Sequence, residues 1–85
     1  MNRLKYFKKE GESADGKLGY FYLEFDGDYI SKQIEVYEDE IVYLDIDHPI
    51  IGNHMLGDQP FEFFDYSENE FISAEDFYEV WNKKK

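Results

Sequence analysis

The sequence has 85 residues, a formal net charge of −11 and no cysteine. This length corresponds to one domain, residues 1–85, and the lack of cysteine excludes a disulfide framework and thiolate chemistry. The 8 Phe, 8 Tyr and 1 Trp provide enough large side chains for a short chain to bury a core. The negative charge argues against direct binding of nucleic acid, whose phosphates require Lys and Arg.

The negative charge is concentrated in the middle of the chain. Residues 19–82 hold 17 Asp or Glu and a single base, Lys32. Such a surface would attract a basic partner, although negative charge also serves solubility alone. The first nine residues lack the apolar stretch of a signal peptide, and no apolar run approaches a membrane span. We therefore expect a soluble, cytoplasmic protein.

Two segments near the N-terminus are expected to form strands. Residues 4–9 are a plausible first strand, and residues 10–17 form a polar loop. Residues 19–26 read as a second strand, with phenylalanines alternating with Tyr20, Tyr22 and Glu24. We place the phenylalanine side in the core and the tyrosine side outward. The Asp26-Gly27-Asp28 sequence predicts a turn.

Residues 32–46 predict a β-hairpin around Glu38-Asp39-Glu40. Keeping one face apolar favours a three-residue loop that pairs Val36 with Val42 and Ile34 with Leu44. Such a loop usually ends in a residue with positive φ, so we expect mild strain at Glu40. The outward face would then carry Glu35, Tyr37, Ile41, Tyr43 and Asp45.

Residues 47–60 are expected to be irregular, and residues 61–65 to form a short strand or an apolar plug under that loop. The loop region contains Asp45, Asp47, His48, His54 and Asp58. No known metal-ligand spacing joins these side chains, and no nucleophile–base pair is evident, so we expect no metal, no cofactor and no catalytic residue.

The last segment predicts a helix that begins after the N-cap Ser73. Asp76 stands at the third helical position, and Ile72 and Phe77 have the spacing of a hydrophobic staple. Lys83 to Lys85 would lie at the negative end of the helix dipole. Phe77, Val80 and Trp81 form one apolar stripe, expected to pack over Ile34, Val36, Val42 and Leu44; a partner groove is the alternative use of this stripe.

Together these elements predict an α+β fold. A three- or four-stranded antiparallel sheet would carry the C-terminal helix on one face.

The order of these features resembles a small, uncharacterised family of bacterial α+β domains. The matching segments cover most of the chain after Gly19: Leu23-Glu24-Phe25-Asp26, Ile34-Glu35-Val36-Tyr37, Leu56-Gly57-Asp58-Gln59-Pro60, and Ile72-Ser73-Ala74-Glu75-Asp76-Phe77 with Trp81. The family's Gly after the turn Asp is Glu40 in this chain. Such small acidic domains look like the immunity proteins encoded beside bacterial toxins, including nuclease toxins, and the resemblance implies that kind of function.

We therefore expect a non-enzymatic inhibitor that binds a basic protein partner, such as a cognate toxin nuclease domain. The expected binding residues are the tyrosines Tyr20, Tyr22, Tyr37 and Tyr43 as anchors, with Glu35, Glu38, Asp39, Asp45 and Asp47 meeting Lys and Arg of the partner. Two alternatives remain open. One is a nucleic-acid mimic that blocks a restriction or CRISPR enzyme, and the other is an interaction module of another kind.

Overall fold

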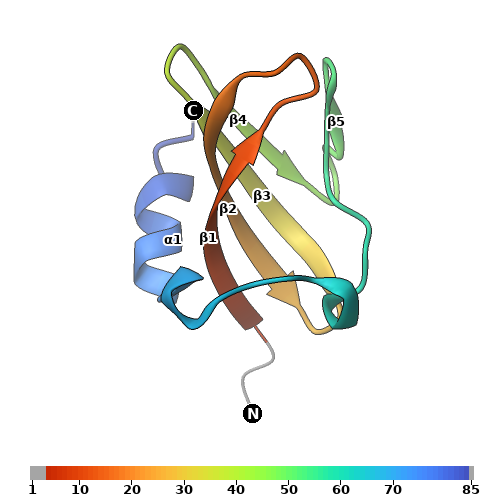
Figure 1. The fold of residues 1–85 in the computed structure, drawn as a ribbon, viewed down its shortest axis with the longest axis vertical. Coiled ribbons are helices and arrows are strands. Elements are labelled where there is room, and N and C mark those ends of the chain that lie inside the picture. Colours follow the sequence, from red (N-terminus) through yellow and green to blue (C-terminus); the bar gives the residue numbers. More distant parts are fainter. Residues whose placement is uncertain (1–3, 85) are drawn as a thin grey trace.

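A five-stranded antiparallel sheet forms the centre of the molecule (Figure 1). The computed structural model describes residues 4–84. The sheet contains β1 (Leu4–Glu12), β2 (Leu18–Asp26), β3 (Tyr29–Tyr37), β4 (Ile41–Asp45) and β7 (Phe71–Ile72) in the order β4-β3-β2-β1-β7. The first four strands follow one another as hairpins, and the short β7 returns to pair with β1 at Tyr6 and Phe7.

The remaining elements are short and lie on the two faces of the sheet. They are β5 (Ile50–Ile51), β6 (His54–Met55), the 3-10 turns η1 (Phe61–Phe63) and η2 (Glu68–Glu70), and the helix α1 (Ala74–Trp81). Figure 1 shows α1 on one side of the sheet and the segment that contains β5 on the other. The predicted α+β class, with an antiparallel sheet and a C-terminal helix packed on it, is confirmed. The sheet has one strand more than expected, because β7 adds two residues to its edge.

The helix covers the sheet face that carries the even-numbered residues of β1 and β2. Phe77 of α1 is fully buried between Tyr6 of β1 and Ile34 of β3. Val80 and Trp81 pack around this cluster, so the predicted apolar stripe belongs to the core. The Ser73 hydroxyl accepts a hydrogen bond from the Asp76 amide at 3.0 Å, which confirms the predicted N-cap.

The opposite face is covered by the segment between β4 and β7. Phe7, Leu23 and Phe25 form a buried cluster there, against which Phe61 and Phe64 pack. Residues 61–64 are thus the apolar plug and not a strand. The segment 47–60 is less irregular than expected, because Ile50–Ile51 and His54–Met55 pair as a small hairpin.

The register of the β3–β4 hairpin differs from the prediction by one residue. Val36 pairs with Ile41 and Ile34 with Tyr43, and residues 38–40 connect the two strands. No described residue other than glycine has a positive φ, so the strain expected at Glu40 is absent.

The physical reason for the error is that both sheet faces are covered. The prediction required a single apolar face, which would put Ile34 and Leu44 on the same side. In the structure Ile34 packs under the helix, whereas Val42 and Leu44 face the other layer with Tyr37. The helix therefore packs over Ile34 and Val36 but not over Val42 and Leu44.

The other expected boundaries hold with small shifts. The first strand extends from residue 4 to residue 12, and the second begins at Leu18. The turn at residues 27–28 is present, with φ of 69° at Gly27. Lys83 and Lys84 follow the helix, and Lys85 lies outside the described residues. Among residues 4–84, no helix has the length and apolar character needed to cross a lipid bilayer.

Candidate functional site

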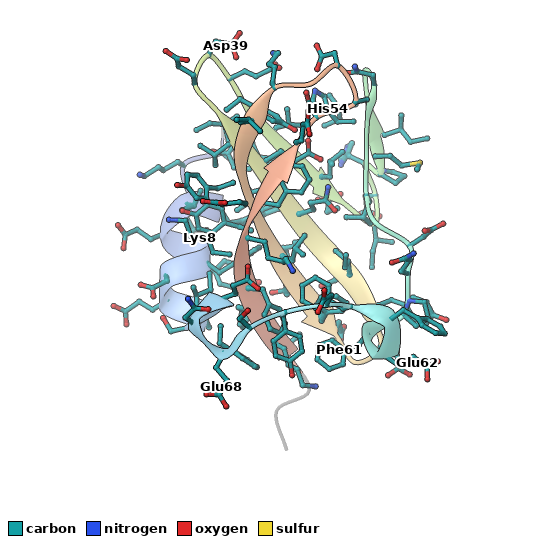
Figure 2. The ribbon with its side chains drawn as sticks, in the orientation of Figure 1. Lys8, Asp39, His54, Phe61, Glu62 and Glu68 are labelled. Atoms are coloured by element: carbon teal, nitrogen blue, oxygen red, sulfur yellow. The ribbon has the colours of Figure 1, made fainter. Side chains whose placement is uncertain are left out.

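The nine residues expected to bind a partner do not share one surface. Strand pairing places Tyr20, Tyr22 and Tyr43 on the helix face, together with Asp45. Glu35 and Tyr37 project from the opposite face. Glu38 and Asp39 form the exposed turn at one end of the sheet, and Asp47 is exposed just after β4. Figure 2 shows Asp39 at the end of the sheet opposite Phe61.

Glu35 and Tyr37 are buried, so the prediction that they lie on an outward face is wrong. Their exposed fractions are 4% and 5%. They lie on the face opposite the helix, as expected, but the small hairpin of β5 and β6 with the residues that follow it to Gly57, which we call the β5–β6 layer, covers that face. Neither side chain is available to a partner unless that layer moves.

Glu35 is the centre of a buried polar network. Its carboxylate accepts hydrogen bonds from Gln33 Nε2 at 2.6 Å and from the Tyr37 hydroxyl, and it lies 2.8 Å from Nδ1 of His54. Burial raises the pKa of Tyr37 well above its ordinary value of 10, and the hydrogen bond to Glu35 adds to this rise. The phenol therefore stays neutral and serves as a donor.

His54 connects this network to the small hairpin. Its Nδ1 lies 2.8 Å from Glu35, its Nε2 lies 3.8 Å from Glu40, and its side chain is 11% exposed. The Gln33 side chain also joins the two layers, because its amide nitrogen donates to the Met55 carbonyl at 3.2 Å and its oxygen accepts from the Gly57 amide at 3.0 Å. The network thus fastens the β5–β6 layer onto the sheet.

A cavity of about 330 Å³ opens beside this network. It lies between the β1–β2 turn at Ser13, the sheet at Leu23 and Gln33, and the hairpin at His54 and Met55. The carboxylate of Glu35 already has three partners, which are Gln33, Tyr37 and His54. Of the polar side chains that line the cavity, Gln33, Glu35 and His54 are therefore engaged in holding the two layers together.

A second buried carboxylate, Glu24, lies under the helix. It accepts hydrogen bonds from the Ser31 hydroxyl at 2.6 Å and from the Tyr78 hydroxyl, and Lys32 Nζ lies 3.1 Å away. Burial alone would raise the pKa of Glu24, but the hydrogen bonds from Ser31, Tyr78 and Lys32 outweigh it and lower the pKa. Glu24 is therefore a charged anchor between β2, β3 and α1.

Glu24 also affects the pKa of two nearby tyrosines, Tyr6 and Tyr78. Burial, followed by the hydrogen bond to Glu24, raises the pKa of Tyr78 to about 12. Burial and hydrogen bonding to Glu24 raise the pKa of Tyr6 further above its ordinary value. Sequence reasoning did not identify this network. The cross-strand pairing of Glu24 with Lys32 was the available signal, because opposite charges favour facing positions in a sheet.

The three tyrosines of the helix face were expected to point outward, but Tyr22 and Tyr43 pack against the core, and Lys8 covers part of the Tyr20 and Tyr22 rings. Lys8 Nζ lies 4.7 Å from the ring centroid of Tyr20 and 5.4 Å from that of Tyr22. Tyr43 contacts Trp81 edge-on, with ring centroids 5.7 Å apart. Of these three rings only Tyr20, at 45% exposure, is strongly exposed.

Several exposed acidic and apolar residues lie at the two ends of β4. Glu38 and Asp39 precede the strand, Asp45 ends it, and Asp47 follows it. Ile41 and Ile46 are 45% and 69% exposed at its two ends. We call these six residues the β4 margin. Five of them are exposed, and Asp45 is partly exposed.

The acidic and histidine side chains do not assemble into a metal site. Within residues 4–84, no group of three or more His, Asp or Glu is arranged to hold a metal ion. Comparisons of the chain with protein-family models, with curated proteins and with solved structures found no match.

Proposed function

We propose that the protein is an acidic inhibitor of the immunity-protein kind, which binds a basic toxin domain, such as a nuclease, and neutralises it in the cytoplasm of the cell that makes it. The observation that carries the proposal is the placement of charge. Glu24 and Glu35 are the buried carboxylates, and both are held by internal donors. Every other Asp and Glu is at least partly exposed.

With most of its carboxylates exposed and a net charge of −11, the protein has a strongly negative surface. Nucleases and other proteins that act on nucleic acid carry Lys and Arg where the phosphates bind. An acidic domain is complementary to such a surface and associates with it quickly at low salt. The exposed isoleucines of the β4 margin add apolar area that charge alone does not supply.

The proposal is tested by co-expression. The C-terminal domain encoded immediately upstream is expressed with and without this protein, and growth is measured. Restored growth together with a stable complex supports an immunity protein. A toxic domain that is not rescued contradicts it, and competition with DNA for other basic targets would then support a nucleic-acid mimic.

A matched pair of charge variants tests the electrostatic part of the proposal. Glu38→Lys changes an exposed carboxylate of the β4 margin, and Glu68→Lys makes the same change at the end of the molecule opposite Asp39 (Figure 2). We expect Glu38→Lys to slow association with the toxin domain more than Glu68→Lys does, and to reduce its dependence on salt. Equal effects would show that only the total charge matters.

A further inference from the structure

The strand β4 ends the sheet on one side. It pairs with β3, and no other described strand pairs with it. An edge strand presents backbone N–H and C=O groups that a second strand can use.

The hydrogen-bond alternation of the hairpin identifies the outward groups. The Tyr37 amide donates to the Glu40 carbonyl at 2.8 Å, which makes Tyr37 and Glu40 a hydrogen-bonded pair. Because such pairs alternate along an antiparallel ladder, Val42 and Leu44 bond inward to β3. The backbone groups of Ile41 and Tyr43 therefore point to the open edge.

This edge lacks the usual protection against pairing. In natural proteins a lysine, a proline or a β-bulge on an edge strand commonly prevents pairing with another chain. Residues 41–46 read Ile-Val-Tyr-Leu-Asp-Ile and contain neither lysine nor proline. The irregularity in the sheet lies between β2 and β3, at Glu24 and Phe25, and not along β4. The segment has strong β propensity and one charge, so it is suited to receive another strand.

The charged residues near β4 indicate which kind of strand could pair with its open edge. Glu38, Asp39 and Glu40 stand at one end of β4, where Lys17 pairs with Asp39 and Glu40, and Asp45 and Asp47 stand at the other, where Lys84 Nζ lies 3.9 Å from Asp45. Acidic side chains outnumber the lysines at both ends. A second copy pairing antiparallel through β4 would bring the acidic end of each strand beside the acidic end of the other, where like charges repel. A strand that carries Lys or Arg would instead be attracted at both ends.

We propose that β4 accepts an extended, lysine- or arginine-bearing strand of the protein partner by β-strand addition. Main-chain hydrogen bonds to Ile41 and Tyr43 would fix the strand, and the carboxylates at the two ends of β4 would select its basic side chains. This inference rests on the proposed function in taking the partner to be a basic protein. It adds the place and the mode of binding.

The first test uses a short synthetic peptide that alternates Lys with Val or Thr, and measures amide hydrogen exchange by NMR. In the free protein the Ile41 and Tyr43 amides should exchange quickly, while those of Val42 and Leu44 exchange slowly. The peptide should slow exchange at Ile41 and Tyr43 by about tenfold or more, consistent with one added backbone hydrogen bond each.

Two control peptides separate the effect of charge from the effect of backbone hydrogen bonding. Replacing Lys by Glu should abolish the protection, and methylating the backbone nitrogens that would face β4 should do the same. No protection by the lysine peptide, or equal protection by the methylated one, would overturn the inference. Slow exchange at Ile41 and Tyr43 in the protein alone, with a dimeric mass, would show that a second copy occupies the edge and would also overturn it.

A variant of β4 tests the same point from the protein side. Ile41→Pro removes an outward N–H at the first residue of an edge strand, where proline is tolerated, and Ile41→Val retains it. We expect peptide affinity to fall about tenfold in Ile41→Pro and to remain within about twofold in Ile41→Val. If Ile41→Pro does not fold, the methylated peptide decides the question.

The outcome can be separated from that of the proposed function. A toxin domain that is rescued, but whose complex leaves the Ile41 and Tyr43 amides in fast exchange, would overturn strand addition and leave the immunity function standing. Protection by the lysine peptide without any rescue would support the acceptor edge and remove the proposed toxin partner.

Discussion

The two buried carboxylates show how single residues hold this fold together. Glu24 and Glu35 are 2% and 4% exposed, and each has three or more donors around it. A buried charge without partners would be strongly destabilising, so these donors are part of the same structural unit. Glu24 joins the helix to the sheet, and Glu35 joins the opposite layer to it.

Glu24 should contribute to the acid sensitivity of the protein. Its folded-state pKa is lowered from the ordinary value of 4.5, so its stabilising effect is complete above pH 4.5 and is lost as the pH falls through the folded-state pKa. In Glu24→Gln we expect the free energy of unfolding at pH 7 to fall by about 1–3 kcal/mol. We also expect a shallower decline on the acid side, measured by urea unfolding across pH 2–7.

The comparison with Asp45 provides a control for this pH dependence. The pKa of Asp45 is also lowered, because its backbone and side-chain hydrogen bonds with His48 outweigh its desolvation, yet Asp45 is more exposed than Glu24. Asp45→Asn should change the acid-side slope less than Glu24→Gln does. A larger change in Asp45→Asn would contradict the role given to Glu24.

At the scale of elements, features that depend on residues close in sequence could be predicted, and features that depend on tertiary packing could not. The N-cap Ser73 and the helix that follows it could be predicted, because the cap bond to Asp76 depends on residues three positions apart. The strands β1 to β4 could be predicted from their alternating apolar and polar residues. The burial of Glu35 and Tyr37 could not be predicted, because it depends on a second layer whose packing has no periodic signal in the sequence.

The same limit explains the parts of the candidate site that were missed. His54 lies 19 residues from Glu35 in the sequence, and Tyr78 lies 54 residues from Glu24. Contacts of this separation are created by the fold. The exposed turn residues Glu38 and Asp39 were placed correctly, because a polar turn between two strands is a local feature.

The β5–β6 layer depends on His54, which gives a test at this scale. His54→Ala removes the side chain that joins the hairpin to Glu35, and should cost about 1–3 kcal/mol. Amide exchange should accelerate in residues 46–57 more than in β1 and β2, as expected for a locally opened segment. Exposed His48 is the matched control, and His48→Ala should change stability by no more than about 0.5 kcal/mol.

The whole molecule has an excess of negative charge that its surface pairs only partly neutralise. Ion pairs such as Lys17–Glu40 and Lys9–Glu70, at 2.9 Å and 3.5 Å, connect exposed or half-exposed groups and contribute little each. The net charge of −11 therefore leaves a repulsive term in the folded state.

Salt should consequently stabilise the free protein while it weakens the complex. Raising the ionic strength from about 0.01 M to about 0.15 M shortens the screening length from about 30 Å to about 8 Å. We expect the melting temperature of the free protein to rise over this range, and association with the basic toxin domain to slow. A melting temperature that falls with salt would mean that the attractive pairs outweigh the repulsion.

The position of Trp81 has a practical consequence for optical measurements. It is the single tryptophan of the chain, and it lies against Tyr43 of β4, with Lys84 Nζ 5.0 Å from its ring centroid and Lys32 Nζ at 5.8 Å. Its fluorescence therefore has one source, located on the helix beside the edge strand with two lysines near its ring. The unmodified protein thus carries an intrinsic fluorophore next to the strand where we place the partner.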